Sequence, residues 1–438
     1  MLEHIVLMNM RFITAFGTQV RHMVRWDAGA MLVVTLSVQG IVIGSQLLAA
    51  FLVSPEVLGA IRWLESAFAI LLLVASCGMP AVAFRETALC EGSFARRRLF
   101  VRAISPTLAV AFLIFFAGCW TYLVDRSLLQ NGLWVWLIAA TGVLFPANVA
   151  RVGIAMIQGA QLARSYWLSL MIIALAGTTV LVWAAFAYGI KGWVAGRYAV
   201  ECALAIFVII IFFRQISGSN RDSQRNLGLR SLLGFGVAAN FALTIRAFCD
   251  NLPILLLKSG ATTPMDLGFF GFASLLLFAP LLLMSVFMQL HTPKLVALHR
   301  QPKEFRGELS HLRNMLLTCG GLGLLSMALF AMVLRFVVES AYEGAALAMF
   351  ILAGTLPFRA IIMTSGAALV ACGRYGTSSI ITFLEVMFIV VIAVLAEVTT
   401  ANAMATTVLS ASVASALLAV LFIQWNDRFL VSSLVEIS

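Results

Sequence analysis

Charged side chains are scarce in this sequence, and the motifs on which catalysis depends are missing. Only 11% of the 438 residues are charged, whereas water-soluble chains carry roughly a quarter, so a soluble globular domain is excluded. The absence of a Walker-type phosphate loop, a nucleophile elbow and a paired-aspartate motif argues against ATP-driven transport by this chain and against an enzyme. The seven cysteines are scattered without a C-x-x-C pair, so we expect small buried side chains rather than disulfides or metal ligands.

Histidine is also rare. The five histidines are His4, His22, His291, His299 and His311, and all are expected in terminal or loop segments. None shares a predicted helix with a second metal ligand. We therefore expect no metal site and no cofactor.

Apolar residues make up 62% of the chain, and they form long runs. A helix needs about 20 mostly apolar residues to cross a bilayer, because lipid offers no hydrogen-bond partner to an exposed backbone. About twelve runs meet this length, which predicts an all-α polytopic membrane protein whose loops are too short for a soluble catalytic domain. The predicted spans are 30–53, 58–83, 104–124, 133–157, 166–188, 192–213, 232–257, 266–290, 314–337, 345–371, 377–397 and 402–424.

Basic residues are divided unevenly between the predicted loops. Twenty of the 29 Lys and Arg residues fall on the side that holds the N-terminus, and five fall on the other side. This bias predicts that both termini are cytoplasmic. The net charge of +10 then reflects topology and contact with anionic membrane lipids, and nucleic-acid binding is not expected. Residues 1–27 lack a cleavage pattern and are predicted to be an interfacial amphipathic segment.

A short pattern of residues occurs twice, about 210 positions apart. Two apolar segments open with the same three residues at an offset of 209, and two others have a proline before them and an arginine at their end, at offsets of 211 and 210. These offsets are close to half the chain, so we expect two similar halves. The matching residues are Pro55, Leu58 and Gly59 with Pro264, Leu267 and Gly268, Pro146 with Pro357, and Arg164 with Arg374.

The repeat predicts how the domains are organised. Six spans in each half, an even number, would start both halves on the same side and give two parallel six-helix repeats around a central cavity. This arrangement allows alternating access by rocking one half against the other. The predicted units are an N-terminal segment (1–27), a first six-helix bundle (28–213), a cytoplasmic linker (214–230), a second bundle (231–424) and a cytoplasmic tail (425–438).

Polar side chains share helical faces in equivalent spans of the two halves. Such faces are expected around an aqueous cavity, although hydrogen bonding between helices would also explain them. They include Thr35, Gln39 and Gln46 in the first span, Asn148, Arg151 and Gln158 in the fourth, Asn240, Thr244 and Asn251 in the seventh, and Thr355 and Arg359 in the tenth.

Ionisable groups within spans are costly, at least about 2.5–3.5 kcal/mol on insertion scales. Two pairs four residues apart are predicted to neutralise themselves on one helix: Arg197 with Glu201 and Arg246 with Asp250. No partner on the same helix is expected for the remaining four: Arg151, Arg359, Glu65 and Glu385.

Two roles are open for the arginines without such a partner. Arg151 and Arg359 are predicted to face the cavity, with interhelical ion pairs to Glu65 or Glu385 as the alternative, and Arg62 is predicted to join the same surface. Arginine favours anions, phosphate above all. Candidate groups for a coupling ion are Glu65, Glu385 and Asp250.

One stretch resembles a known family. The residues S-P-E-V-L-G-A-I-R-W from Ser54 and C-G-M-P-A-V-A-F-R-E from Cys77 resemble the turns that open and close the second span of polysaccharide flippases. These Wzx-type proteins transport lipid-linked oligosaccharides and belong to the multidrug/oligosaccharidyl-lipid/polysaccharide (MOP) superfamily. The matching residues are Pro55, Gly59, Gly78, Pro80 and Arg85, and Ala371–Arg374 resembles the family's "A-x-G-R" ending of the tenth span.

The resemblance implies a function. It implies a flippase of the bacterial inner membrane that moves an undecaprenyl-pyrophosphate-linked oligosaccharide outward, together with other membrane proteins of polysaccharide assembly. Expected substrate-binding residues are Arg151, Arg359, Arg246, Arg62, Gln39 and Gln158. The main alternative is a cation-coupled multidrug exporter of the same fold, favoured if Glu65 and Asp250 face the cavity while the arginines point away. A membrane-embedded sugar polymerase or ligase is a third class, but such enzymes usually carry a large outer loop that this chain lacks.

Overall fold

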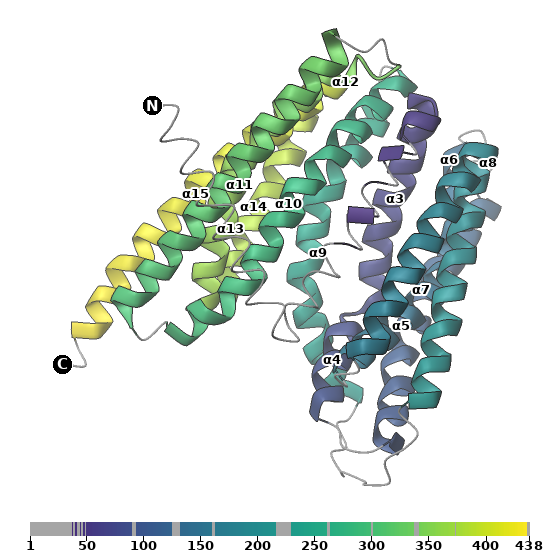
Figure 1. Ribbon diagram of the computed structural model, residues 1–438, viewed down its shortest axis with the longest axis horizontal. Coiled ribbons are helices and arrows are strands. Elements are labelled where there is room, and N and C mark those ends of the chain that lie inside the picture. The colour runs from purple at the N-terminus through teal and green to yellow at the C-terminus, as the bar shows by residue number, and fades with distance from the viewer. Residues whose placement is uncertain are drawn as a thin grey trace.

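The computed structural model shows a helical protein whose two halves lie side by side (Figure 1). It describes residues 37, 40, 41, 44, 47, 48, 50–89, 93–124, 132–159, 163–215, 229–260, 263–298, 301–336, 341–372 and 374–435. The predicted segment 1–27, Gln39 and most of the linker 214–230 lie outside these residues.

Long apolar helices dominate the part of the chain that is described. Eight of them are long and apolar enough to cross a membrane, or nine if α6 and α7 form one bent span. The prediction of an all-α polytopic membrane protein is confirmed. The helices are α3 (Pro55–Ser76), α4 (Met79–Leu89), α5 (Ser93–Val124), α6 (Gly132–Thr141), α7 (Leu144–Gly159), α8 (Ala163–Gln215), α9 (Leu229–Gly260), α10 (Pro264–Leu298), α11 (Pro302–Phe336), α12 (Ala345–Ala353), α13 (Thr355–Ala371), α14 (Tyr375–Leu395) and α15 (Ala401–Val435).

The repeated prolines perform the same tasks in both halves. Pro55 and Pro264 are the first residues of α3 and α10, where a missing N–H and a fixed φ are favourable. Pro146 and Pro357 lie in the first turns of α7 and α13, and each removes the N–H that would continue the preceding helix. The fourth and tenth predicted spans are therefore broken, and α6 and α7 meet at 44°.

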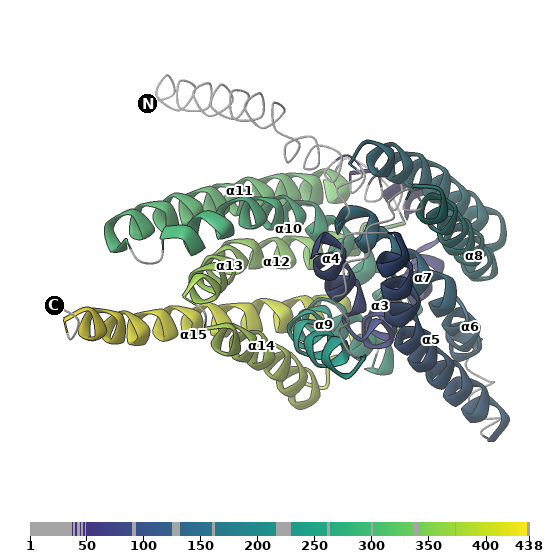
Figure 2. The same ribbon diagram turned by 90° about the horizontal axis from the view of Figure 1, so that it is seen from below.

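The two halves meet most closely through α3 and α10. The backbones of Gly59 and Gly268 touch: a Cβ on Gly59 would lie 2.5 Å from the Gly268 nitrogen, and one on Gly268 would overlap the Pro55 carbonyl. Residues of the sequence repeat thus pack against their own counterparts. From this end, α11 and α15 slant away from α5 and α8 (Figures 1 and 2).

A second contact joins the halves at the other end of α3. The predicted span 58–83 is not one helix, because Cys77 and Gly78 adopt positive φ angles of 48° and 68° between α3 and α4. The Gly78 backbone lies against Gly236 of α9, with no space for a Cβ on either residue. Nearby, the Asn240 side-chain amide donates to the Leu73 carbonyl at 2.8 Å.

Several predicted boundaries differ from the structure. The prediction that His291 and His311 lie in loops is wrong, since both are in helices, α10 and α11. Each of these helices has 35 residues, about 52 Å at 1.5 Å per residue, which exceeds a hydrocarbon core of about 30 Å. In the parts of α10 and α11 that extend beyond this thickness, His291 Nδ1 lies 2.6 Å from Glu308 Oε1. Likewise, α15 continues to Val435 rather than ending near 424.

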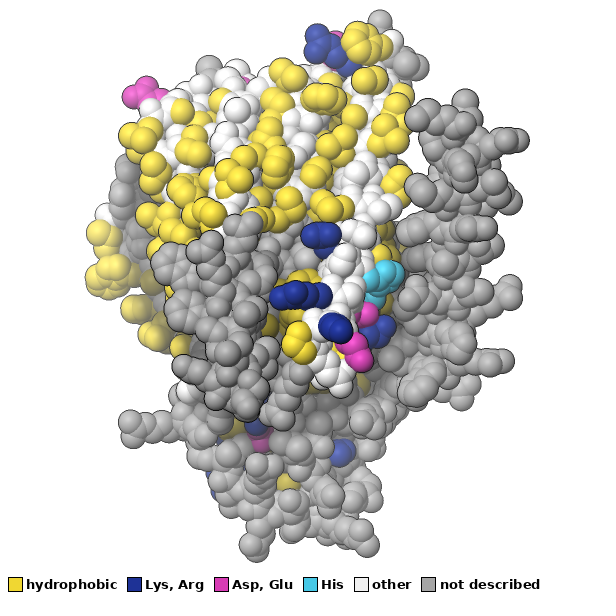
Figure 3. Space-filling model, turned by 90° about the vertical axis from the view of Figure 1, so that its left-hand side faces the viewer, with side chains coloured by type: hydrophobic (Ala, Val, Ile, Leu, Met, Phe, Trp, Pro, Cys, Tyr) yellow, Lys and Arg dark blue, Asp and Glu magenta, His cyan; other side chains and the backbone are white. Residues whose placement is uncertain are grey.

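The left-hand face of the molecule in Figure 1 has an apolar part and a charged part. Hydrophobic side chains cover most of its upper part, and most of the described Lys, Arg, Asp, Glu and His side chains gather below them (Figure 3). Between the fifth and sixth predicted spans, α8 is interrupted at Gly189, which has a φ of 59°.

Candidate functional site

Three ionisable or thiol side chains lie on α9 just before a proline. Pro253 stands inside the helix and cannot donate to the carbonyl of Cys249, which loosens this turn. Arg246 Nε lies 3.2 Å from Asp250 Oδ2. The pairing of Arg246 with Asp250 on one helix is confirmed, and a second oxygen of Asp250 remains directed elsewhere.

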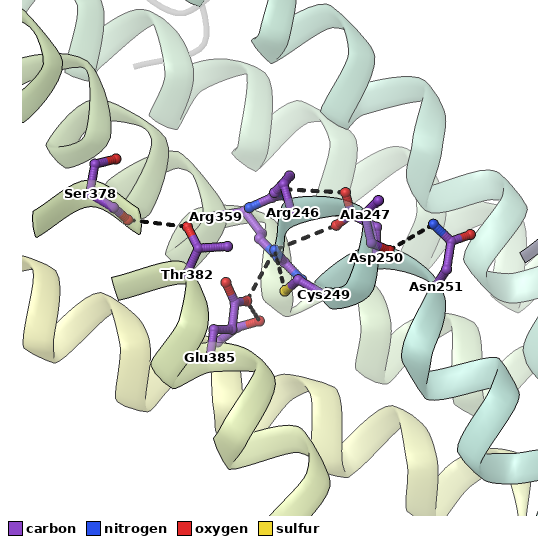
Figure 4. A network of polar contacts seen from close by, with 10 residues as sticks. Arg246, Ala247, Cys249, Asp250, Asn251, Arg359, Ser378, Thr382 and Glu385 are labelled. Atoms are coloured by element: carbon purple, nitrogen blue, oxygen red, sulfur yellow. Dashed lines mark hydrogen bonds and ion pairs between the residues drawn. The ribbon is translucent and has the colours of Figure 1, made fainter. Parts of the chain in front are cut away.

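That second oxygen faces Arg359, which comes from α13. Arg359 Nη1 lies 3.0 Å from Glu385 Oε1 on α14 and 3.8 Å from Asp250 Oδ1, and it contacts Cys249 Sγ at 3.6 Å (Figure 4). The side chain of Arg359 is 3% exposed and that of Glu385 is fully buried. Arg359 therefore forms the interhelical ion pair with Glu385 that the sequence offered as an alternative.

Glu385 is held in turn by α15. Ser412 Oγ donates to its Oε1 at 3.4 Å, while Oε2 has no hydrogen-bond partner among the described residues. The cluster therefore joins four helices of the second half, three through charged side chains and α15 through the Ser412 hydroxyl. Removing one member would leave the others uncompensated in a low-dielectric interior.

The first half contributes Arg62 from α3. Arg62 Nη1 lies 2.7 Å from Glu65 Oε2, so the expectation that Glu65 has no partner on its own helix is wrong. The Arg62 stem passes Gly271 of α10, where a Cβ would come within 3.2 Å. Its guanidinium lies 5.7 Å from the ring centre of Phe278, a favourable cation–π distance. Arg62 therefore reaches from the first half into the second.

Arg62 and Arg359 line one small cavity. Its volume is about 40 Å³, and its lining includes Ser66, Cys249 and Asp250, so it is large enough for water or a ligand oxygen. The Nε donors of Arg62 and Arg359 are both buried and have no acceptor among the described residues. Since buried donors are normally satisfied, this cavity is suited to a water molecule or a ligand oxygen that accepts from them.

A larger cavity of about 460 Å³ adjoins it in the second half. Asp250, Phe278 and Leu281 line both cavities. Arg246, Asp250 and three hydroxyl side chains provide its polar groups, and methionine, leucine and isoleucine provide most of the rest. Its hydroxyl-bearing residues are Ser285, Ser378 and Thr382.

Among the side chains that are described, the predicted site residues on α7 and α8 of the first half do not join the cluster around Arg359. Arg197 Nη2 and Glu201 Oε1 are 3.2 Å apart, which confirms their pairing on one helix. Arg151 is exposed on α7 and interacts electrostatically with both, but it does not line the cavity that Arg62 and Arg359 share. Gln158 lies near the end of α7 with its side chain outside the described part. Among the described residues there is no cluster of metal ligands.

Sequence reasoning missed Cys249, Ser412 and Gly271. Cys249 and Ser412 are neutral residues in apolar helices, and nothing in their spacing singles them out. Gly271 does carry a signal: it lies 209 residues after Arg62, at the same offset as Gly268 from Gly59.

Compared by sequence, the chain matches no protein-family model and no curated protein. Compared by structure, it resembles an inward-facing multidrug resistance MATE family transporter of the MOP superfamily (TM-score 0.68, 14% identity, 92% of this chain and 96% of that one). It also resembles the inward closed form of the lipid II flippase MurJ (0.70, 11%, 90% and 87%). A third similar structure is an outward-facing MATE family transporter (0.66, 14%, 93% and 95%). The chain has the fold of these MOP-superfamily proteins.

Proposed function

We propose that this chain is a flippase that moves an undecaprenyl-pyrophosphate-linked oligosaccharide from the inner to the outer leaflet of the bacterial cytoplasmic membrane, for cell-surface polysaccharide biosynthesis. The observation that carries the proposal is the pair of buried, unsatisfied Nε donors of Arg62 and Arg359 at one cavity. Diphosphate oxygens are the acceptors that arginine binds best. A protein of similar fold is named as a lipid II flippase, which supports a lipid-linked substrate.

The diphosphate would bind at the contact between the halves. Arg62 comes from α3 in the first half and Arg359 from α13 in the second. A ligand that both arginines hold would stabilise the arrangement in which they are close, and alternating access would release it when the halves rock apart. The hydroxyl-lined cavity beside them would take sugars, and the lipid tail would remain in the bilayer.

The acids of the cluster would couple this binding to an ion. Three arginines (Arg62, Arg246 and Arg359) are balanced by three acids (Glu65, Asp250 and Glu385). A phosphate that takes a donor from an arginine releases the carboxylate that the donor had neutralised. That carboxylate would then bind a proton or a sodium ion, so Glu65, Glu385 and Asp250 remain our candidates.

In this proposal Arg151, Gln39 and Gln158 are substrate contacts of the first half, used in the other conformation of the transporter. Both termini are cytoplasmic, and the halves are residues 28–213 and 231–424. Partners would be other membrane proteins of polysaccharide assembly.

A cation-coupled multidrug exporter is the second candidate. It is favoured by Asp250, which lines both cavities, and by the MATE family transporters of similar fold. That function would be preferred if the arginines pointed away from the cavity. Arg62 and Arg359 line the smaller cavity and Arg246 lines the larger one. The anionic substrate is therefore the better candidate.

The test is transport of a fluorescent undecaprenyl-pyrophosphate oligosaccharide in proteoliposomes. Arg62→Gln, which removes a charge-assisted hydrogen bond worth about 1.5–3 kcal/mol, should reduce transport by about tenfold or more. Arg62→Lys keeps the charge but loses Nε and the planar guanidinium, so its transport rate should lie between those of the wild type and Arg62→Gln. The matched control is Arg335→Gln, at an exposed arginine on α11. Wild-type transport by Arg62→Gln would discard this site, and export of a cationic dye without lipid transport would favour the exporter.

A further inference from the structure

Another cavity lies on a different part of the contact between the halves. It measures about 540 Å³ and is formed by α3 and α6 of the first half and by the end of α9 from the second. Its lining residues are Trp63, Ala67, Gly132, Leu133, Trp134, Leu137, Leu255, Lys258 and Ser259. We call it the tryptophan pocket. It shares no residue with the cavities around Arg62 and Arg359.

The repeat explains why this pocket is open. Trp63 has Phe272 as its counterpart 209 residues later, and Trp134 has Tyr342 after 208 residues. Both aromatic pairs form: Trp63 and Trp134 at 5.4 Å between ring centres, and Phe272 and Tyr342 at 4.8 Å. Each half therefore contains an equivalent aromatic pair on one side of a potential pocket.

The aromatic pair of the second half, Phe272 and Tyr342, is covered by the segment that precedes α3. The Phe51 ring packs edge-on against Phe272 at 6.1 Å between centres, and the Tyr342 hydroxyl donates to the Val53 carbonyl at 3.0 Å. The position 209 residues after Phe51 is Gly260, at the end of α9. Gly260 has no side chain that could cover Trp134 in the same way, and Trp134 is 42% exposed.

Gly260 also holds the end of α9 against its own half. A Cβ at Gly260 would lie 2.6 Å from the Val398 carbonyl, so this backbone packs against the turn before α15. As a result, α9 touches the first half at Gly236 and lies beside the tryptophan pocket at its other end. The tryptophan pocket is open because the second half has Gly260 at the position where the first half has Phe51.

The chemistry of the tryptophan pocket is that of a glycolipid head-group site. Trp134 is 42% exposed and offers indole surface for a sugar ring, while the buried Trp63 supports it edge-on from behind. Lys258 and Ser259 are exposed at the rim and provide a cation and a hydroxyl for a phosphate. Leucine side chains complete an apolar floor.

We propose that the tryptophan pocket binds the diphosphate-linked sugar of the transported glycolipid on its exit side, with the Trp134 indole on the sugar and Lys258 on the phosphate. The inference rests on the proposed function, because it takes the substrate and the outward direction from it. Under the positive-inside distribution, the end of α9 at Lys258 lies on the outer side. The pocket would receive the head group after the Arg62 and Arg359 cavity has released it.

The test is a binding measurement on the full chain in neutral phosphatidylcholine nanodiscs. The probe is a short-chain polyprenyl diphosphate that carries one sugar, titrated by calorimetry. We expect two binding sites in the wild type. Trp134→Ala and Lys258→Gln should each weaken one of them by about tenfold or more, and Arg62→Gln should weaken only the other. Matched controls are Trp120→Ala and Arg335→Gln, at exposed residues outside the pocket.

The outcomes separate the two proposals. Wild-type binding in both pocket variants would overturn the inference, whatever Arg62→Gln does. Loss of one site in the pocket variants with unchanged binding in Arg62→Gln would support the pocket and count against the proposed central site. Displacement of the probe by an equal concentration of phosphatidylglycerol would overturn the inference in favour of a general anionic-lipid site. No binding of the probe by the wild type would overturn both.

Discussion

Arg62 lies against Gly271, the residue that occupies the same place in the second half of the chain. The two positions are 209 residues apart, and Gly271 leaves only enough room for the Arg62 stem to pass. The repeat therefore is not symmetrical in charge at this point. One half sends a guanidinium across the contact, and the other half makes space for it.

Gly271→Leu tests this relationship without changing any charge. The added side chain should push Arg62 away from the cavity that it shares with Arg359 and reduce lipid transport by about tenfold or more, since one charge-assisted contact is lost. Gly321→Leu is the matched control, because a Cβ at Gly321 of α11 meets nothing within 4 Å. Equal transport rates for the two variants would contradict the role given to Gly271.

The Arg359–Glu385 pair should behave as a unit in a double-mutant cycle. Arg359→Met or Glu385→Leu alone leaves a buried charged group without its partner and should cost about 3–5 kcal/mol of stability. Arg359→Met combined with Glu385→Leu should cost less than the sum of the single changes, because both charges are then absent. Thermal unfolding in detergent provides the measurement. Strictly additive effects would show that the 3.0 Å contact does not couple the two residues.

Gly268→Ala should destabilise the contact between α3 and α10. Its Cβ would overlap the Pro55 carbonyl, and overpacking of this kind typically costs about 1–3 kcal/mol. Gly321→Ala should have the opposite sign and stabilise α11 by about 0.5–1 kcal/mol, because only the helix preference of alanine changes there. A stability gain in both variants would mean that the helices at Gly268 separate without penalty.

Pro357→Ala should separate stability from transport. The new N–H can donate to the Ala353 carbonyl and straighten the break between α12 and α13, which moves Arg359 at the start of α13. We expect unchanged or higher thermal stability together with slower lipid transport. The outcome that would contradict this is transport at the wild-type rate by a stably folded Pro357→Ala protein.

Much of the fold could be predicted because its causes are local. Apolar runs define the spans, and the prolines that begin or break helices recur at fixed offsets. The break at Gly354 was not predicted, although Pro357 marks it, and the break at Cys77 was implied only by the resemblance of its G-M-P run to a family turn, not by hydropathy. Hydropathy also says nothing about how far a helix continues past the lipid, which is why the histidines of α10 and α11 were assigned to loops.

The candidate site could be predicted only in its parts. Pairs on one helix follow from spacing, and Arg62 with Glu65 at three residues apart was readable in the same way. The meeting of Arg62 with Arg359 depends on how two halves dock, and no residue spacing contains that information. The pairing of Arg359 with Glu385 requires the relative rotation of α13 and α14, which likewise is fixed by packing.

The contact of Pro55 and Gly59 with Leu267 and Gly268 has a consequence for how tightly the halves need to bind. Residues that pack against their own counterparts form an isologous interface, as in a symmetric homodimer. Here the two partners belong to one chain, so their effective concentration is set by the connecting segment and reaches the millimolar range for short flexible links. The apolar core that α3 and α10 share around this contact, which includes Leu58, Leu64, Leu267 and Phe270, then needs less intrinsic affinity to keep the halves in register than an interface between separate subunits would need.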